Sequence, residues 1–155
     1  MLFRSKAGWQ ALLSFAKQVD AYSDTRNLPG TPGTSRLSPF LKVGAIHPRT
    51  IVHAVQGASS GRTAFISEIC WREFYADVLF HQPESIWRNL QSQFDHLAVD
   101  RDASATERFQ VWARGETGYP LVDAGMRQLL NEGWMHNRVR MVVASFLVKI
   151  GRAHV

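Results

Sequence analysis

The chain has 155 residues, 45% of them hydrophobic, which suits one globular domain with a sizeable core. The formal charge is +5, and a single cysteine, Cys70, excludes an intrachain disulfide and fits a reducing cytoplasm. No run approaches the ~18 unbroken apolar residues of a membrane span, and the basic opening segment is not followed by the small-residue cleavage site of a signal peptide. Because Cys70 lies in an aromatic run, we expect a buried, inert thiol.

Helical periodicity dominates the chain, and no run alternates apolar and polar residues as a half-buried strand does. The predicted helices cover residues 8–22, 39–43, 48–56, 61–80, 105–114, 119–131 and 137–148. Gly115 and Gly133 are predicted helix ends, and Asn137 is the predicted N-cap of the last helix. Residues 26–39 are a proline- and glycine-rich loop, and residues 81–106 are the least regular part. The predicted fold class is all-α, with helix 61–80 buried on most sides by its aromatic content.

Basic residues gather in two stretches that contain no acid, residues 25–67 and residues 133–155. The basic side chains of these stretches are Arg26, Arg36, Lys42, Arg49, Arg62, Arg138, Arg140, Lys149 and Arg152. Two such stretches in one domain can converge on a phosphate-rich ligand. The alternative is a solvated basic surface, and charge alone does not decide between the two.

The segment GTSRLS, residues 33–38, places a glycine, three hydroxyl side chains and an arginine ahead of a helix. Hydroxyls, free backbone N–H groups and a positive helix end suit a phosphate. The alternative is ordinary capping, with Ser38 as the N-cap before Pro39.

The segment SEICWREFY, residues 67–75, places Glu68 and Arg72 four residues apart on one helix face, with Trp71 beside them. One interpretation is a surface ion pair. The other is that both charges line a cavity, because the surrounding apolar residues would otherwise bury them at a cost.

The segment GWMHNRVRM, residues 133–141, holds a polar cluster at the start of the last helix. Trp134 is expected to pack in the turn after Gly133. Arg138 and Arg140 lie two residues apart and therefore point in different directions. His136 has no second metal ligand at a suitable spacing, so a metal site is rejected.

Three long segments in the same order resemble the flavin-binding domain of the photolyase/cryptochrome family. They are YSDTRNLPGTPGTSRLSPFLKVGAIHPR, EICWREFY and TGYPLVDAGMRQLLNEGWMHNRVRMVVASFLVK, within residues 22–149. GWMHNRVRM is most similar to the members that repair cyclobutane pyrimidine dimers. Plant-type cryptochromes usually carry aspartate at the position of Asn137 and lack methionine at that of Met141.

The resemblance implies FAD as the cofactor and DNA containing pyrimidine dimers as the partner. The implied FAD-binding residues are Tyr22, Thr34, Ser35, Arg36, Leu37, Ser38, Phe65, Glu68, Arg72, Asn137 and Arg140. The implied catalytic residues, which line the lesion pocket, are Glu68, Trp71, Asn137 and Met141. The implied DNA-binding residues are Arg26, Trp71 and Arg138, where Trp71 would stack on the flipped dimer and the arginines would hold phosphates.

The implied reaction is light-driven dimer splitting by an electron from excited reduced FAD. Two departures from the family are Phe65, where many relatives have tryptophan near the flavin, and the lack of a relay tryptophan shortly before Trp112. The remaining alternatives are a cryptochrome-like blue-light sensor and a flavin-free helical DNA-binding module.

The resemblance also predicts a fragment, in which residues 1–149 are a partial helical FAD-binding domain. Such a fragment lacks the N-terminal α/β domain, which would hold any antenna chromophore, and the C-terminal part of the flavin pocket. Residues 150–155, IGRAHV, lack the family pattern and match the translation of a common sequencing adapter, so we interpret them as an artefactual tail. The fragment is expected to bind FAD weakly and to repair nothing alone, whereas the full-length protein is expected to be a cytoplasmic monomer without membrane contact.

Overall fold

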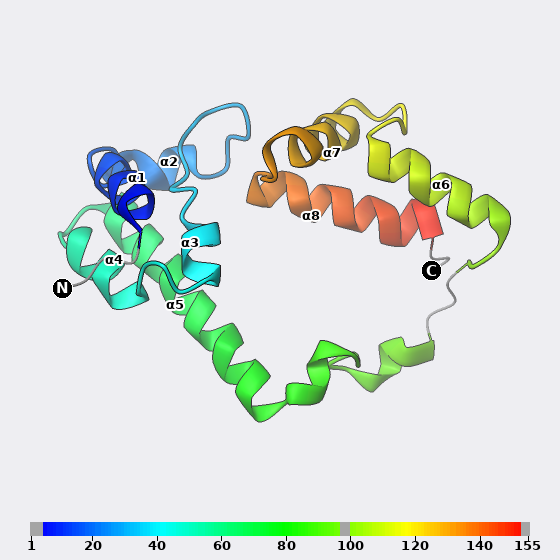
Figure 1. Ribbon diagram of the computed structural model, residues 1–155, viewed down its shortest axis with the longest axis horizontal. Helices are drawn as coiled ribbons and strands as arrows, with labels where there is room; N and C mark the ends of the chain where they lie inside the picture. The colour runs from blue at the N-terminus through cyan, green and yellow to red at the C-terminus, as the bar shows by residue number, and fades with distance from the viewer. Residues whose placement is uncertain (1–4, 97–99, 153–155) are drawn as a thin grey trace. The chain divides into compact units, whose positions relative to one another are not determined.

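The computed structural model describes residues 5–96 and 100–152, and within these residues every regular element is a helix (Figure 1). The chain divides into two compact units, residues 1–86 and residues 87–155. The all-α prediction is therefore confirmed. No helix in the described part of the chain has the length and apolar character needed to cross a membrane.

The first unit is built on one long helix, α5, against which shorter helices pack. Its elements are α1 (Lys6–Ala16), the 3-10 turn η1 (Val19–Ala21), α2 (Tyr22–Thr25), α3 (Ser38–Lys42), α4 (Pro48–Ala54), α5 (Ser60–His81) and η2 (Pro83–Ile86). Helix α5 contacts α2, η1 and α4. The core of this unit is formed by Leu12, Phe15, Val19, Tyr22, Leu37, Leu41, Ile46, Ile51, Val55, Phe65 and Ile69.

The predicted helix over residues 8–22 is wrong in its second half. Helix α1 ends at Ala16, and Gln18 leaves helical geometry with φ −120° and ψ 4°. The chain then continues as η1 and α2, which keeps the apolar spacing while changing direction. Leu12, Phe15 and Val19 are all buried, so burial continues although the helix is interrupted.

Helix α5 confirms the prediction of a long helix, but its expected burial is wrong beyond Ile69. Phe65 and Ile69 are buried, whereas Phe74, Tyr75 and Phe80 are exposed. Cys70 is exposed as well, so the prediction of a buried thiol is also wrong. Aromatic content alone does not bury a helix, because burial requires packed neighbours.

The described residues of the second unit form three helices and two short helical segments. Its elements are η3 (Ser92–His96), α6 (Ala103–Arg114), α7 (Pro120–Glu132), α8 (Asn137–Phe146) and the π-helical η4 (Leu147–Arg152). Helices α6, α7 and α8 contact one another in chain order, and η4 contacts α6 and α8. The core comprises Val122, Met126, Met135, Val139 and Val143, with Trp112 and Phe146 packed against it.

Glycines end α6 and α7 as predicted. Gly115 and Gly133 adopt left-handed backbone with φ 67° and 64°, which glycine tolerates without a steric penalty. The predicted cap of α8 is wrong. His136 is the N-cap, and Asn137 is the first residue of the helix.

Candidate functional site

The junction between α2 and the first half of α5 brings together four of the residues singled out in the sequence. The guanidinium of Arg26 donates a hydrogen bond to the carboxylate of Glu68 and lies 5.4 Å from the centre of the Tyr22 ring. Tyr22 in turn meets Phe65 edge-on, with ring centres 5.2 Å apart. A guanidinium, a carboxylate and two aromatic rings are thus held next to one another.

Glu68 therefore does not pair with Arg72. The interpretation of these two residues as a surface ion pair is wrong. Arg72 instead donates to its neighbour Glu73, and both of these side chains are exposed. The four-residue spacing allows a Glu68–Arg72 contact, but Arg26 competes for the same carboxylate from α2. Of the two cations that could pair with the Glu68 carboxylate, the helix packing brings Arg26 into contact.

A second polar cluster fixes this junction at the start of α5. Asp20 accepts a 2.7 Å hydrogen bond from Nε of Arg62 and another from the hydroxyl of Ser59, the N-cap of α5. The hydrogen bond from Arg62, followed by that from Ser59, lowers the pKa of Asp20 below its ordinary value of 3.8. Gly61 is buried against the backbone carbonyls of Val19 and Asp20, and a Cβ at this position would overlap with both oxygens. These contacts hold η1, which leads directly into α2, against the start of α5.

The GTSRLS loop is attached directly to α2. Gly33 is buried against Thr25, where a Cβ would overlap with the threonine side chain. Leu37 is 1% exposed and anchors the other end of the loop in the core. Between these anchors Arg36 has φ 50°, a left-handed conformation that is costly for a residue with a Cβ.

The hydroxyl groups of this loop lie at or near the surface. Thr34 and Ser35 are half-buried and Ser38 is exposed, and the Ser35 hydroxyl accepts a 3.4 Å hydrogen bond from the Leu37 N–H. Ser38 is the first residue of α3, and α3 has no side-chain cap, so the interpretation of Ser38 as an N-cap is wrong. A surface loop with hydroxyls and one cation can bind an anion by hydrogen bonds and charge.

Trp71 lies farther along α5, on its exposed half. Its side chain is 52% exposed and its ring meets Phe74 edge-on at 5.5 Å. Tyr75 also contacts both rings, which gives α5 an exposed aromatic cluster of three side chains. Such a surface can stack on a planar ligand.

In the second unit, the first turn of α8 carries the remaining candidates. Asn137 is exposed, and Nη1 of Arg138 lies 3.6 Å from Sδ of Met141 in hydrogen-bonding geometry. Arg140 points elsewhere, since its Nη2 donates to the carbonyl of Met135 at 3.4 Å. The two arginines thus take different directions, as their spacing predicts.

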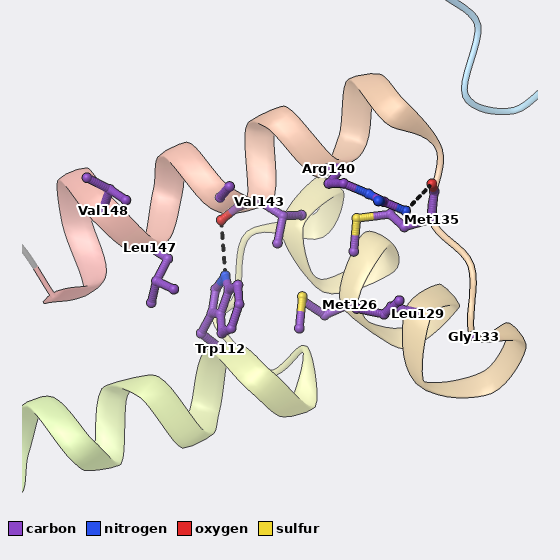
Figure 2. A pocket seen from close by; sticks show the side chains of 10 residues that line it. Trp112, Met126, Leu129, Gly133, Met135, Arg140, Val143, Leu147 and Val148 are labelled. Atoms are coloured by element: carbon purple, nitrogen blue, oxygen red, sulfur yellow. Dashed lines mark hydrogen bonds between the residues drawn. The ribbon is translucent and has the colours of Figure 1, made fainter. Parts of the chain in front are cut away.

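Arg140 also borders an apolar pocket of about 530 Å³ (Figure 2). Trp112 closes one side of this pocket, and its indole Nε1 donates to the Val143 carbonyl at 3.1 Å, which joins α6 to α8. The other lining residues are Met126, Leu129, Gly133, Met135, Val143, Ala144, Leu147 and Val148. Arg140 is thus the charged residue in a lining that is otherwise apolar.

Sequence reasoning missed several residues that organise these sites. They include Asp20 in η1, Gly61 and Arg62 at the start of α5, and His136 as the cap of α8. The two ion pairs of the junction, Asp20–Arg62 and Arg26–Glu68, each join positions 42 apart. No local pattern in the sequence indicates these pairs, because the two partners of each lie on different elements. No group of three metal ligands forms within the described residues.

A family model described as the FAD binding domain of DNA photolyase matches residues 65–153. The deoxyribodipyrimidine photo-lyase of Alkalihalophilus pseudofirmus is 45% identical over 136 residues, and that of Agrobacterium fabrum is 48% identical over 136 residues. These alignments cover 86% and 84% of this chain but 28% of each relative, so the chain spans less than a third of their length.

Solved structures of the same family share the fold. The class III photolyase of Agrobacterium tumefaciens matches with a TM-score of 0.87 and 44% identity, over 92% of this chain and 30% of that structure. A cryptochrome of Synechocystis matches with a TM-score of 0.82 and 33% identity, over 94% of this chain and 32% of that structure. Together with the family model and the relatives, these matches confirm the resemblance stated from the sequence motifs. The chain belongs to the family of DNA photolyase FAD-binding domains.

Proposed function

We propose that this chain is part of a deoxyribodipyrimidine photo-lyase, an enzyme that repairs cyclobutane pyrimidine dimers in DNA under light. Reduced FAD, when bound, would supply light-driven one-electron chemistry, in which the electron that splits the dimer returns to the flavin. The observation that carries the proposal is the α2–α5 junction, where Glu68, Arg26 and Tyr22 are held together beside the GTSRLS loop. The deoxyribodipyrimidine photo-lyases among the relatives support the same assignment.

The residues of the first unit fit the diphosphate end of FAD. Thr34, Ser35 and Ser38 offer surface hydroxyls, and Arg36 adds a cation on the same loop. Tyr22, Leu37 and Phe65 supply the buried apolar base of the loop. Hydroxyl and guanidinium donors above an apolar base suit a phosphate with an attached planar ring.

For the isoalloxazine end of FAD we assign Arg72 and Glu68 of the first unit and, separately, Asn137 and Arg140 of the second unit. Arg72 is exposed on α5, one turn beyond Glu68, and Asn137 is exposed at the start of α8. Guanidinium and amide groups can donate to the ring oxygens and nitrogens, and the Asn137 amide can also accept.

The proposed lesion-binding residues are Glu68 and Trp71 in the first unit and, separately, Asn137 and Met141 in the second unit. Trp71 is 52% exposed on α5 and therefore accessible for stacking on the flipped dimer. Glu68 would hydrogen-bond the dimer, and its pairing with the Arg26 guanidinium would offset the negative charge of the carboxylate as negative charge develops on the carbonyl oxygens of the dimer.

Arg26 and Arg138 are the proposed phosphate contacts. Both would bind the DNA backbone and hence add affinity without sequence preference. The protein that contains this chain would act as a cytoplasmic monomer on DNA, without membrane contact.

A chimeric enzyme tests the proposal directly. Residues 5–149 of this chain would replace the matching segment of the Agrobacterium fabrum photo-lyase, to which the chain is 48% identical. We expect the purified chimera to bind FAD and to remove dimers from irradiated DNA under blue light but not in the dark. Trp71→Ala and Glu68→Ala should each reduce dimer removal at least ten-fold, or about 1.4 kcal/mol. Phe80→Ala, which removes an exposed aromatic side chain from the same helix, is the matched control and should leave repair unchanged.

The same chimera separates the two other functions. A folded, flavin-loaded chimera that repairs nothing would favour a blue-light sensor, a candidate supported by the likeness to the Synechocystis cryptochrome. A folded chimera that binds DNA but no flavin would favour a flavin-free DNA-binding module. Dimer removal that survives both Trp71→Ala and Glu68→Ala would contradict the residue assignments.

A further inference from the structure

Two helices of the chain begin with a histidine that caps them in the same way. Nδ1 of His47 accepts a hydrogen bond from the N–H of Arg49 at 3.1 Å, and Nδ1 of His136 accepts one from the N–H of Arg138 at 3.2 Å. In both cases the histidine is the N-cap, and the donor is the second residue of the helix. An N-cap side chain stabilises a helix by accepting from one of the N–H groups that the helix itself leaves unbonded.

This geometry fixes the protonation of the imidazole. A ring nitrogen can accept a hydrogen bond only when it carries no proton, so Nδ1 must be bare in both histidines. A neutral ring then carries its proton on Nε2. The cap therefore requires one particular neutral tautomer of each histidine.

The two caps differ in their surroundings. His47 is exposed on α4, whereas His136 is 1% exposed and meets the Trp134 ring edge-on at 6.2 Å. His136 also provides the backbone carbonyl for the first helical hydrogen bond of α8, from the N–H of Arg140 at 2.9 Å. Its ring and its carbonyl together hold the first turn of α8.

We infer that His136, as the neutral Nε2–H tautomer, is a positioning residue for the first turn of α8. Through the cap it sets the backbone from which Asn137, Arg138 and Met141 project. The functional part of this inference rests on the proposed function, because it takes Arg138 as a DNA contact. The structural part, the tautomer and the cap, stands independently of that function.

Two substitutions separate the cap from the packing of the ring. His136→Asn keeps a side chain that accepts from a helix N–H but removes the ring, and His136→Phe keeps an aromatic ring but removes the acceptor. The matched controls are His47→Asn and His47→Phe, which make the same changes at the exposed cap of α4. All variants are made in the whole chain of 155 residues.

The first measurement is structural. Nitrogen-15 spectra of the wild-type chain at neutral pH should show His136 with Nδ1 unprotonated and Nε2 protonated. Amide exchange at Arg138 should become about five-fold faster in His136→Phe and stay within about two-fold in His136→Asn, a range that corresponds to the loss or retention of an N-cap. The His47→Phe control should accelerate exchange at Arg49 and leave Arg138 unchanged.

The second measurement is binding of the same variants to a DNA duplex that contains one cyclobutane pyrimidine dimer. His136→Phe should weaken binding about five-fold, while His136→Asn and both His47 variants should bind as the wild type does. A protonated Nδ1 in the wild type would overturn the inference, and this measurement does not depend on whether any variant folds. Unchanged amide exchange at Arg138 in His136→Phe would overturn it as well. Equal DNA binding by wild type and His136→Phe would overturn the positioning role. A wild-type chain that shows the expected tautomer and exchange but binds no DNA would count against the proposed function and leave the cap established.

Discussion

The guanidinium of Arg26 and the carboxylate of Glu68 form an ion pair across 42 positions of the sequence. Their side chains are 21% and 35% exposed, so the pair is partly shielded from solvent. Partial burial strengthens the attraction between the two charges. Removing one partner would leave the other charge partly buried and unpaired, which destabilises the fold. The pair therefore couples α2 to α5 at the point where the proposed lesion-binding carboxylate lies.

A double-mutant cycle of Arg26→Gln and Glu68→Gln should give a coupling energy of about 1 kcal/mol, measured by urea unfolding. The exposed pair Arg72–Glu73 provides the matched control, and its cycle should give less than about 0.5 kcal/mol. Equal coupling in the two cycles would mean that the α2–α5 junction adds nothing to an ordinary surface ion pair.

The left-handed backbone of Arg36 leads to a second prediction. A residue with a Cβ pays about 1–2 kcal/mol for this conformation, whereas glycine loses about 0.5–1 kcal/mol through its freedom in the unfolded chain. Arg36→Gly should therefore be more stable than Arg36→Ala by about 0.5–1 kcal/mol in urea unfolding. The same pair of substitutions at Ser35, which is not among the positive-φ residues, should give the opposite order. If Arg36→Gly proves the less stable of its pair, the loop conformation is contradicted.

The sequence was sufficient for those features that local chemistry decides. Gly115 and Gly133 end their helices because a left-handed residue is needed there, and glycine supplies it most easily. The segments GTSRLS and GWMHNRVRM were picked out by residue type alone, and the structure places both at helix starts. Helix class and approximate extent follow from periodicity in the same way.

The features that depend on partners distant in sequence were not predictable. Glu68 had a plausible partner four residues away, and only the packing of α2 on α5 gives the carboxylate to Arg26. Asn137 is a stronger cap by residue type than histidine, but the backbone enters α8 one residue earlier, at His136. Cys70 looked buried because its neighbours are apolar, yet the second half of α5 is exposed.

Asp123 gives a prediction for the dependence of stability on pH. Its carboxylate accepts hydrogen bonds from the hydroxyl of Thr117 at 2.6 Å, from the Thr117 N–H at 2.8 Å and from the Gly118 N–H at 2.9 Å. These bonds, the Thr117 hydroxyl foremost, lower the pKa of Asp123 below its ordinary value of 3.8. The unfolded chain then binds a proton at a higher pH than the folded chain does, so the stabilisation is complete above about pH 5 and is lost as the pH falls below 3.8 towards the lowered pKa.

Asp123→Asn should therefore lower the melting temperature at pH 7 and flatten the decline of stability between about pH 5 and pH 2. Part of the decline should persist, because Asp20 has a lowered pKa of the same sign. Thr117→Val, which removes only the hydroxyl donor, should have a smaller effect in the same direction. Glu107→Gln, at an exposed carboxylate of α6, is the control and should change neither the melting temperature nor its pH profile. An unchanged profile in Asp123→Asn would show that the turn before α7 does not depend on this carboxylate.

The close packing of α7 on α8 depends on Gly125, which gives the last prediction. A Cβ at this position would overlap with Cγ1 of Val139 and lie 3.0 Å from Cγ2 of Val143, so the two helices approach through the space that glycine leaves. Gly125→Ala should destabilise the chain by about 1–3 kcal/mol through overpacking, although alanine alone favours a helix by about 1 kcal/mol. The double variant Gly125→Ala with Val139→Ala removes the overlapping methyl groups and should be more stable than the sum of the two single effects predicts. Gly30→Ala, at a loop position with open space around it, is the control and should lie within about 0.5 kcal/mol of the wild type in urea unfolding.

Because α8 carries Asn137, Arg138, Arg140 and Met141, Gly125→Ala should also slow dimer removal in the chimeric photo-lyase, and the double variant should restore it. Strict additivity of the two substitutions would show that α7 and α8 do not meet through Gly125 and Val139.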